Sequence, residues 1–148
     1  MKQNIIFMFT LLTILSIVNA IPYQFYKRAT TFTPCDTDSP NDITVTITPD
    51  PLIAGEKGTF NIVGTITNGT VNTGSQLVIE LKDDADAVIG DPSTFDICAS
   101  ATCPITDLNL TQVIQLPDTL PNTFIIDVNI FDVNGDTLAC ATSAVPGA

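Results

Sequence analysis

Carboxylates are the first side chains to consider for chemistry, because the 148-residue chain has 16 Asp and Glu residues and no histidine. The missing histidine excludes Ser-His and Cys-His nucleophile pairs, a histidine general base and histidine-ligated zinc. Paired carboxylates can hydrolyse glycosides, but sixteen acidic residues form pairs by chance. We therefore predict that the protein is not an enzyme, and a hydrolase would need a carboxylate pair within a cleft.

Two acidic segments offer hard oxygen ligands of the kind that calcium prefers. Asp83-Asp84-Ala85-Asp86 lacks the glycine and the terminal glutamate of the known calcium loop. Asp132-Val133-Asn134-Gly135-Asp136 contains Asn-Gly, which is typical of a tight hairpin in which both central residues have positive φ. We predict turns at both segments, with neither a metal site nor a cofactor.

The net charge of −11 also limits the partners. A nucleic-acid-binding protein needs Lys and Arg to displace counterions from phosphates, and five basic residues against sixteen acidic ones do not supply them. We therefore expect no nucleic-acid partner.

The amino terminus has the pattern of a secretory signal peptide. Lys2 precedes an uncharged apolar run, and the segment 1–20 ends in Val18-Asn19-Ala20, whose small last residue suits cleavage. The apolar run is rather short to span a membrane. Lys27-Arg28 is either a dibasic processing site, which makes 21–28 a propeptide, or an ordinary pair of surface charges. We expect the mature domain to occupy 29–148.

The four cysteines agree with secretion, since an even number behind a signal peptide indicates two disulfides with three possible pairings. The close spacing of Cys98 and Cys103 favours a local clip, which leaves Cys35 to pair with Cys140. Two glycosylation sequons begin at Asn68 and Asn109.

The rest of the chain predicts strands separated by turns. Apolar and polar residues alternate with the period of half-buried strands, and Gly and Pro residues punctuate them. No stretch predicts a helix, so we expect an all-β antiparallel sandwich of about seven strands in two sheets. The predicted strands are Ile43–Ile47, Phe60–Thr67, Leu77–Lys82, Ala87–Ile89, Leu110–Leu116, Phe124–Ile130 and Thr137–Val145.

Several short motifs identify a family resemblance. The most specific is Phe95-Asp96-Ile97-Cys98 followed by Cys103-Pro104-Ile105. The others are Ile47-Thr48-Pro49-Asp50-Pro51, Leu116-Pro117 with Leu120-Pro121 and Phe124, and the closing Asn134-Gly135 with Leu138 and Cys140. In this order, from about Cys35 to Val145, the chain resembles the ML lipid-recognition domain. Within that group it looks most like the fungal phosphatidylglycerol/phosphatidylinositol transfer proteins.

The resemblance implies an Ig-like sandwich whose sheets separate to hold a phospholipid or a sterol, and the disulfides Cys35–Cys140 and Cys98–Cys103. It also implies a monomeric secreted or vacuolar lipid carrier that meets donor and acceptor membranes transiently. The alternative is a secreted interaction module of the same fold with a closed cavity. Aliphatic and aromatic residues of the alternating strands are the predicted lipid contacts, or simply core: Phe60, Ile62, Leu77, Ile79, Ile114, Phe124, Ile126, Val128 and Ile130.

Overall fold

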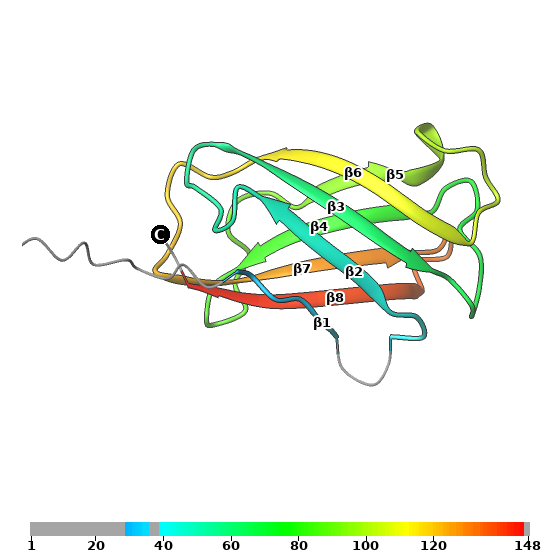
Figure 1. The fold of residues 1–148 in the computed structure, drawn as a ribbon, viewed down its shortest axis with the longest axis horizontal. Helices are drawn as coiled ribbons and strands as arrows, with labels where there is room; N and C mark the ends of the chain where they lie inside the picture. The colour runs from blue at the N-terminus through cyan, green and yellow to red at the C-terminus, as the bar shows by residue number, and fades with distance from the viewer. Residues whose placement is uncertain (1–28, 36–38, 147–148) are drawn as a thin grey trace, which may run out of the picture.

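The computed structural model describes residues 29–35 and 39–146. The predicted signal peptide, 1–20, and the possible propeptide, 21–28, lie outside the described residues. The chain forms two antiparallel sheets, as predicted. One has the strand order β1-β8-β7-β4-β5 and the other β2-β3-β6, and the sheets lie face to face (Figure 1). The strands are β1 (Thr33–Pro34), β2 (Ile43–Thr48), β3 (Lys57–Thr65), β4 (Gln76–Lys82), β5 (Ser93–Asp96), β6 (Asp107–Gln115), β7 (Thr123–Phe131) and β8 (Thr137–Pro146).

The alternation of apolar and polar residues determines which side of each strand faces the core. Along β2 the buried residues Ile43, Val45 and Ile47 alternate with exposed threonines, and β7 follows the same rule. The inward side chains of both sheets meet in one cluster. This is the arrangement in which period-2 patterning buries the apolar face of each sheet.

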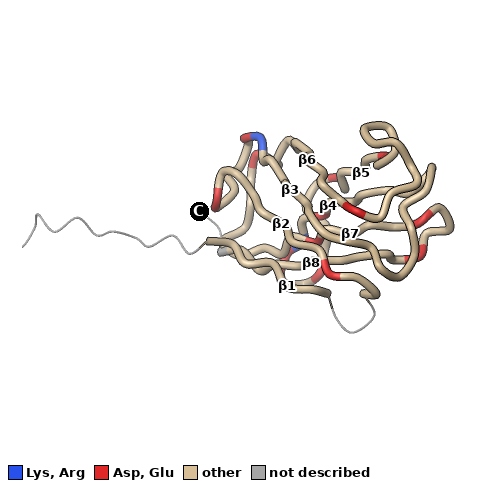
Figure 2. Tube along the Cα trace, turned by 45° about the vertical axis from the view of Figure 1, so that its right-hand side comes forward, with Lys and Arg blue, Asp and Glu red and all other residues tan. Residues whose placement is uncertain are grey.

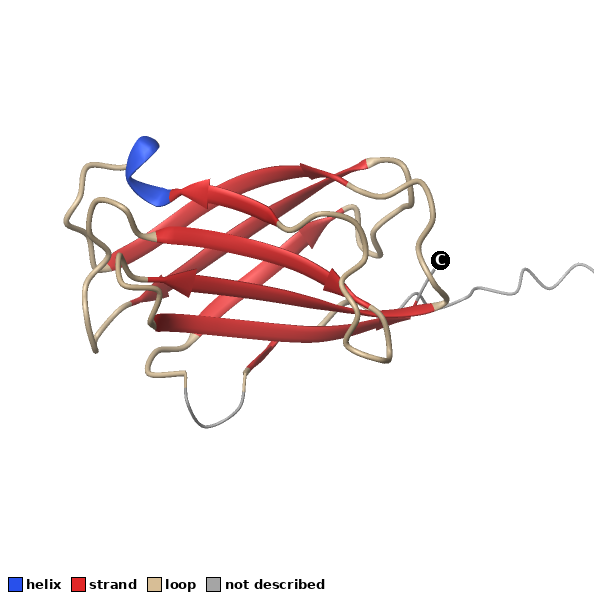
Figure 3. Cartoon of the chain, turned by 180° about the vertical axis from the view of Figure 1, so that it is seen from behind, coloured by secondary structure: helices blue, strands red, loops and turns tan. Residues whose placement is uncertain are grey.

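Two edge strands differ from the sequence prediction. The predicted strand Ala87–Ile89 was wrong, because in that segment only Val88 forms a bridge, to Lys82. The edge strand is instead β5, whose Ser-Thr-Phe-Asp sequence lacks a strong alternation but pairs with β4. The short strand β1, which the sequence analysis also missed, pairs with β8. Figure 3 shows the five-stranded sheet from its outer side.

The β7–β8 hairpin forms where Asn134-Gly135 predicted it, but its turn is longer than expected. Gly135 has a φ of +88°, whereas Asn134 has no positive φ. Phe131 pairs with Thr137, so five residues make the connection. One carboxylate oxygen of Asp132 accepts hydrogen bonds from the backbone N–H groups of Asn134 and Asp136, both at 2.8 Å, and thereby stabilises this loop.

One end of the sandwich is firmly cross-linked. The disulfides Cys35–Cys140 and Cys98–Cys103 form as predicted. Nearby, the buried Asn41 side chain joins the start of β2 to the loop after β3 and to Leu138 of β8. Neither disulfide lies at the opposite end of the sandwich.

Candidate functional site

A cleft of about 510 Å³ opens between the two sheets at that opposite end. It lies where the edge strand β5 of the larger sheet approaches the edge strand β6 of the smaller one. Its volume lies within the range of roughly 300–1,000 Å³ that is usual for small-molecule sites. The cleft therefore lies at the less cross-linked end of the sandwich.

The cleft exists because the chain between β4 and β5 leaves the sheet. Ile79 pairs with Ser93 and Lys82 bridges Val88, so two residues of β4 lie opposite the four residues 89–92. The extra length forms a bulge over the sheet edge. Gly90, with a φ of +75°, makes this path possible, and Pro92 cannot donate a ladder hydrogen bond.

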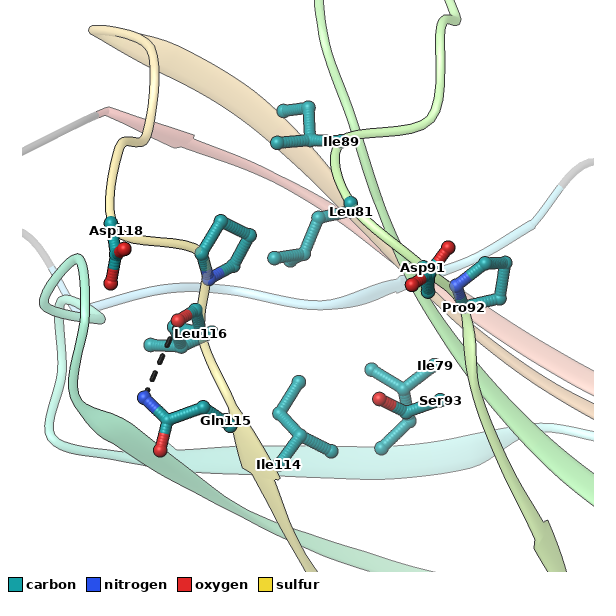
Figure 4. A pocket seen from close by; sticks show the side chains of 12 residues that line it. Ile79, Leu81, Ile89, Asp91, Pro92, Ser93, Ile114, Gln115, Leu116 and Asp118 are labelled. Atoms are coloured by element: carbon teal, nitrogen blue, oxygen red, sulfur yellow. Dashed lines mark hydrogen bonds between the residues drawn. The ribbon is translucent and has the colours of Figure 1, made fainter.

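The floor of the cleft is aliphatic. Ile79 and Leu81 of β4 face Ile114 and Leu116 on and just after β6, and all four side chains are at most 5% exposed. Ile89, which is partly buried, packs beside them. Figure 4 shows these side chains converging on one space from the two sheets. Such a floor can shield hydrocarbon from water, which favours binding by about 0.8 kcal/mol of free energy per buried methylene.

The rim is polar and carries two carboxylates. Asp91 and Asp118 are exposed and lie on opposite sides of the cleft, with Leu81 between them (Figure 4). Ser93 and Gln115 complete the polar part of the rim. The Gln115 side-chain nitrogen donates to the Gly55 carbonyl at 2.8 Å, so this amide is fixed toward the neighbouring loop.

No cation lines this rim in the described part of the chain, where the basic residues are Lys57 and Lys82. Lys57 is exposed beside Gln115 on the outer face of the smaller sheet. Lys82 lies on the outer face of the larger sheet, where its Nζ contacts Asp127 at 2.7 Å and Glu80 at 3.5 Å. The hydrogen bond to Asp127 raises the pKa of Lys82 above its usual range, against an opposing effect of burial. Acidic residues are spread along the trace, mainly at turns (Figure 2).

The nine predicted lipid contacts all lie in the buried region between the sheets. Two of them, Ile79 and Ile114, line the cleft. The other seven belong to the closed core and do not line it: Phe60, Ile62, Leu77, Phe124, Ile126, Val128 and Ile130. Their contact with a ligand stays a prediction, and it would require the sheets to separate beyond the cleft.

Sequence reasoning missed most of the cleft. Leu81 and Ile89 stand in apolar alternations, and Leu116-Pro117 belongs to a motif already noted, so their apolar character was visible. Nothing in the local sequence predicted that Asp91 and Asp118 lie at the rim, because their positions depend on how two separate loops pack in the folded protein.

The acidic turns are explained by their backbone contacts. A carboxylate oxygen of Asp83 accepts hydrogen bonds from the N–H groups of Ala85 and Ala87, both at 2.9 Å.

Within residues 29–35 and 39–146, no group of three His, Cys, Asp or Glu side chains is arranged to hold a metal ion. The same residues contain no helix long and apolar enough to cross a membrane. The sequon residues Asn68 and Asn109 are exposed, and their glycosylation stays a prediction.

Solved structures show where this fold occurs elsewhere. No protein-family model matches the chain, and no curated protein matches it. A Niemann-Pick type C2 protein from the Japanese carpenter ant superposes with a TM-score of 0.58 at 12% identity, covering 80% of this chain and 99% of that chain. Chicken MD-1, solved in complex with lipid IVa, superposes with a TM-score of 0.50 at 12% identity, covering 78% of this chain and 87% of that chain. The likeness shows a shared fold.

Proposed function

We propose that this protein binds a lipid, whose apolar part enters the cleft between the sheets while its polar end stays at the rim. The observation that carries the proposal is the aliphatic floor of the cleft between two sheet edges, formed by the nearly buried side chains of Ile79, Leu81, Ile114 and Leu116. The shared fold supports it, because one of the similar structures holds a lipid. We further propose a monomeric, non-enzymatic carrier that reaches a secretory or vacuolar compartment and exchanges lipid with membranes.

Because two carboxylates line the cleft, a hydrolase is the second function to consider. Asp91 and Asp118 both line the cleft, from opposite sides, and a hydrolase would need them to act as a carboxylate pair. The described residues that line the cleft, however, are aliphatic residues, proline, glycine, Ser93, Gln115 and the two aspartates, and none of them is aromatic. Hydrocarbon suits that surface better than a sugar does, since a sugar needs many convergent hydrogen-bonding groups.

The alternative function is an interaction module with a closed interior. The observation that favours it is the packing of seven predicted lipid contacts into the core, away from the cleft. The two functions differ in one measurable property, which is uptake of lipid by the purified protein.

The test begins with the full chain secreted from eukaryotic cells. Native mass spectrometry and solvent extraction should reveal a co-purified lipid, and a fluorescent lipid should bind after delipidation. Intact-mass analysis of the same sample reports whether the chain is cut after Ala20 or Arg28 and whether Asn68 and Asn109 carry glycans. A ligand-free protein that takes up no fluorescent lipid would leave only the interaction module or the hydrolase.

A matched pair of variants locates the binding site. Ile89→Trp puts a large ring into the cleft, and we expect it to reduce lipid binding at least tenfold. Val88→Trp is the control, because Val88 is the adjacent aliphatic residue, is 45% exposed and does not line the cleft. Equal binding by both variants would place the lipid elsewhere.

A further inference from the structure

We propose that the cleft selects single-chain amphiphiles with a cationic head, the long-chain amine class. This inference rests on the proposed lipid-binding function and adds the chemistry of the ligand's polar end. Two independent properties of the cleft carry it, namely its volume and the charge of its rim.

The volume limits the apolar part of the ligand. A methylene group occupies about the same space as a water molecule, whose share of liquid volume is ~30 Å³. The cleft of about 510 Å³ therefore has room for roughly 17 such groups, which is one long alkyl chain. Two chains of a diacyl phospholipid would need about twice that space, and the closed core beyond Ile79 and Ile114 does not provide it.

The rim determines the preferred charge of the head. The head of a ligand whose chain lies in the cleft meets a rim that has Asp91 on one side of Leu81 and Asp118 on the other (Figure 4). An ammonium group can donate to either of these carboxylates, whereas a phosphate or carboxylate head meets like charges, and none of the described residues that line the rim is basic. Lys57, which pairs with the rim residue Gln115, belongs to the outer face of the smaller sheet.

The loop that contains Gly55 packs against the rim, and the Gly55 backbone donor is already in use. An added Cβ on Gly55 would lie 3.6 Å from a carboxylate oxygen of Asp118, so this loop packs directly against that aspartate. The backbone N–H of Gly55 is already used by the Pro117 carbonyl at 2.8 Å. The Gln115 amide nitrogen is used by the Gly55 carbonyl. These two donors are thus occupied, and a ligand that brings its own donor can pair with the rim carboxylates.

The test compares ligands that differ only in their heads. Hexadecylamine, hexadecanol and hexadecanoate, each below its aggregation threshold, displace a neutral polarity-sensitive fluorophore from the delipidated full-length protein at low ionic strength. Exposed ion pairs contribute modestly, so we expect the amine to bind about tenfold more tightly than the alcohol and the acid to bind more weakly than the alcohol. The preference should shrink at high salt.

Two matched double variants distinguish the effect of the rim carboxylates on ligand preference from the effect of the protein's net charge. Asp91→Asn with Asp118→Asn should remove most of the amine preference, so that hexadecylamine and hexadecanol bind with similar affinities. Asp42→Asn with Asp136→Asn changes the net charge equally at exposed sites near the opposite end, and the preference should persist. Equal affinities for amine and acid in the unmodified protein, or equal effects of the two double variants, overturn the inference. Failure of all three ligands and of the fluorophore to bind overturns the proposed function instead.

Discussion

Substituting Asn41 by alanine tests whether one buried amide holds the cross-linked end of the sandwich together. Asn41 is 5% exposed. Its Oδ1 accepts from the N–H groups of Thr67 and Asn68 at 2.7 and 2.9 Å. Its Nδ2 donates to the carbonyls of Leu138 and Asn68 at 2.7 and 3.0 Å. Three segments distant in sequence therefore depend on one side chain.

The expected loss follows from which partners water can reach. Thr67 and Asn68 are exposed, so their backbone groups can rehydrate after the substitution. Leu138 is buried, and its carbonyl is left without a partner, which costs roughly 1–3 kcal/mol. With the other lost bonds, we expect Asn41→Ala to lower the free energy of unfolding by about 3 kcal/mol, or the Tm by roughly 10 °C for a domain of this size. Asn41→Asp should cost at least as much, because it turns a carboxylate oxygen toward two carbonyls.

Urea denaturation and thermal unfolding of the secreted protein measure this loss, with the exposed Asn122→Ala as the control. The control should stay within about 0.5 kcal/mol of the unmodified protein. Hydrogen exchange should show lost protection at Thr67 and Asn68, while lipid affinity stays unchanged because the cleft lies at the other end. A loss under about 0.5 kcal/mol for Asn41→Ala would refute the reasoning, since it would mean that water replaces the whole network.

Three further predictions concern stability. Lys82→Met should lower the free energy of unfolding by about 1 kcal/mol near neutral pH. Because the ion pair raises the pKa of Lys82, this difference in stability should be present below pH 10.5 and disappear as the pH rises above the raised pKa. Denaturation at several alkaline pH values measures it. The pKa of Asp132 is lowered, mainly by the hydrogen bond from the Asp136 N–H, so its stabilising effect should be present above pH 3.8 and lost as the pH falls through the lowered pKa; the Tm values of Asp132→Ala and the unmodified protein should therefore converge in acid, and a constant difference would contradict this. Replacing both Cys35 and Cys140 by serine should destabilise more than replacing Cys98 and Cys103, by the chain-entropy model about 4.7 against about 2 kcal/mol, because the bridges span 105 and 5 residues; equal losses in urea denaturation would exclude a dominant loop-closure effect.

The strands with strong alternation were predictable because their burial depends on the local period of apolar residues. The strands Ile43–Ile47 and Phe124–Ile130 could be predicted without tertiary information. Strict alternation of apolar and polar residues is typical of a strand that has one buried and one exposed face. The edge strands were harder to predict. β5 is held by pairing with β4 and not by its own residues, whereas Ala87–Ile89 has the apolar residues of a strand but turns away after a single bridge.

The sequence by itself determined the all-β class, the absence of histidine chemistry, the composition of the core and the sites of the turns, because each follows from residue type and local spacing. Only the tertiary structure decided where the interior opens. The position of the cleft depends on four residues opposing two across β4 and β5, and on the loops that place Asp91 and Asp118 on opposite sides of its rim. Local sequence carries no record of that juxtaposition, because it arises when two loops far apart in the chain meet at one end of the packed sandwich.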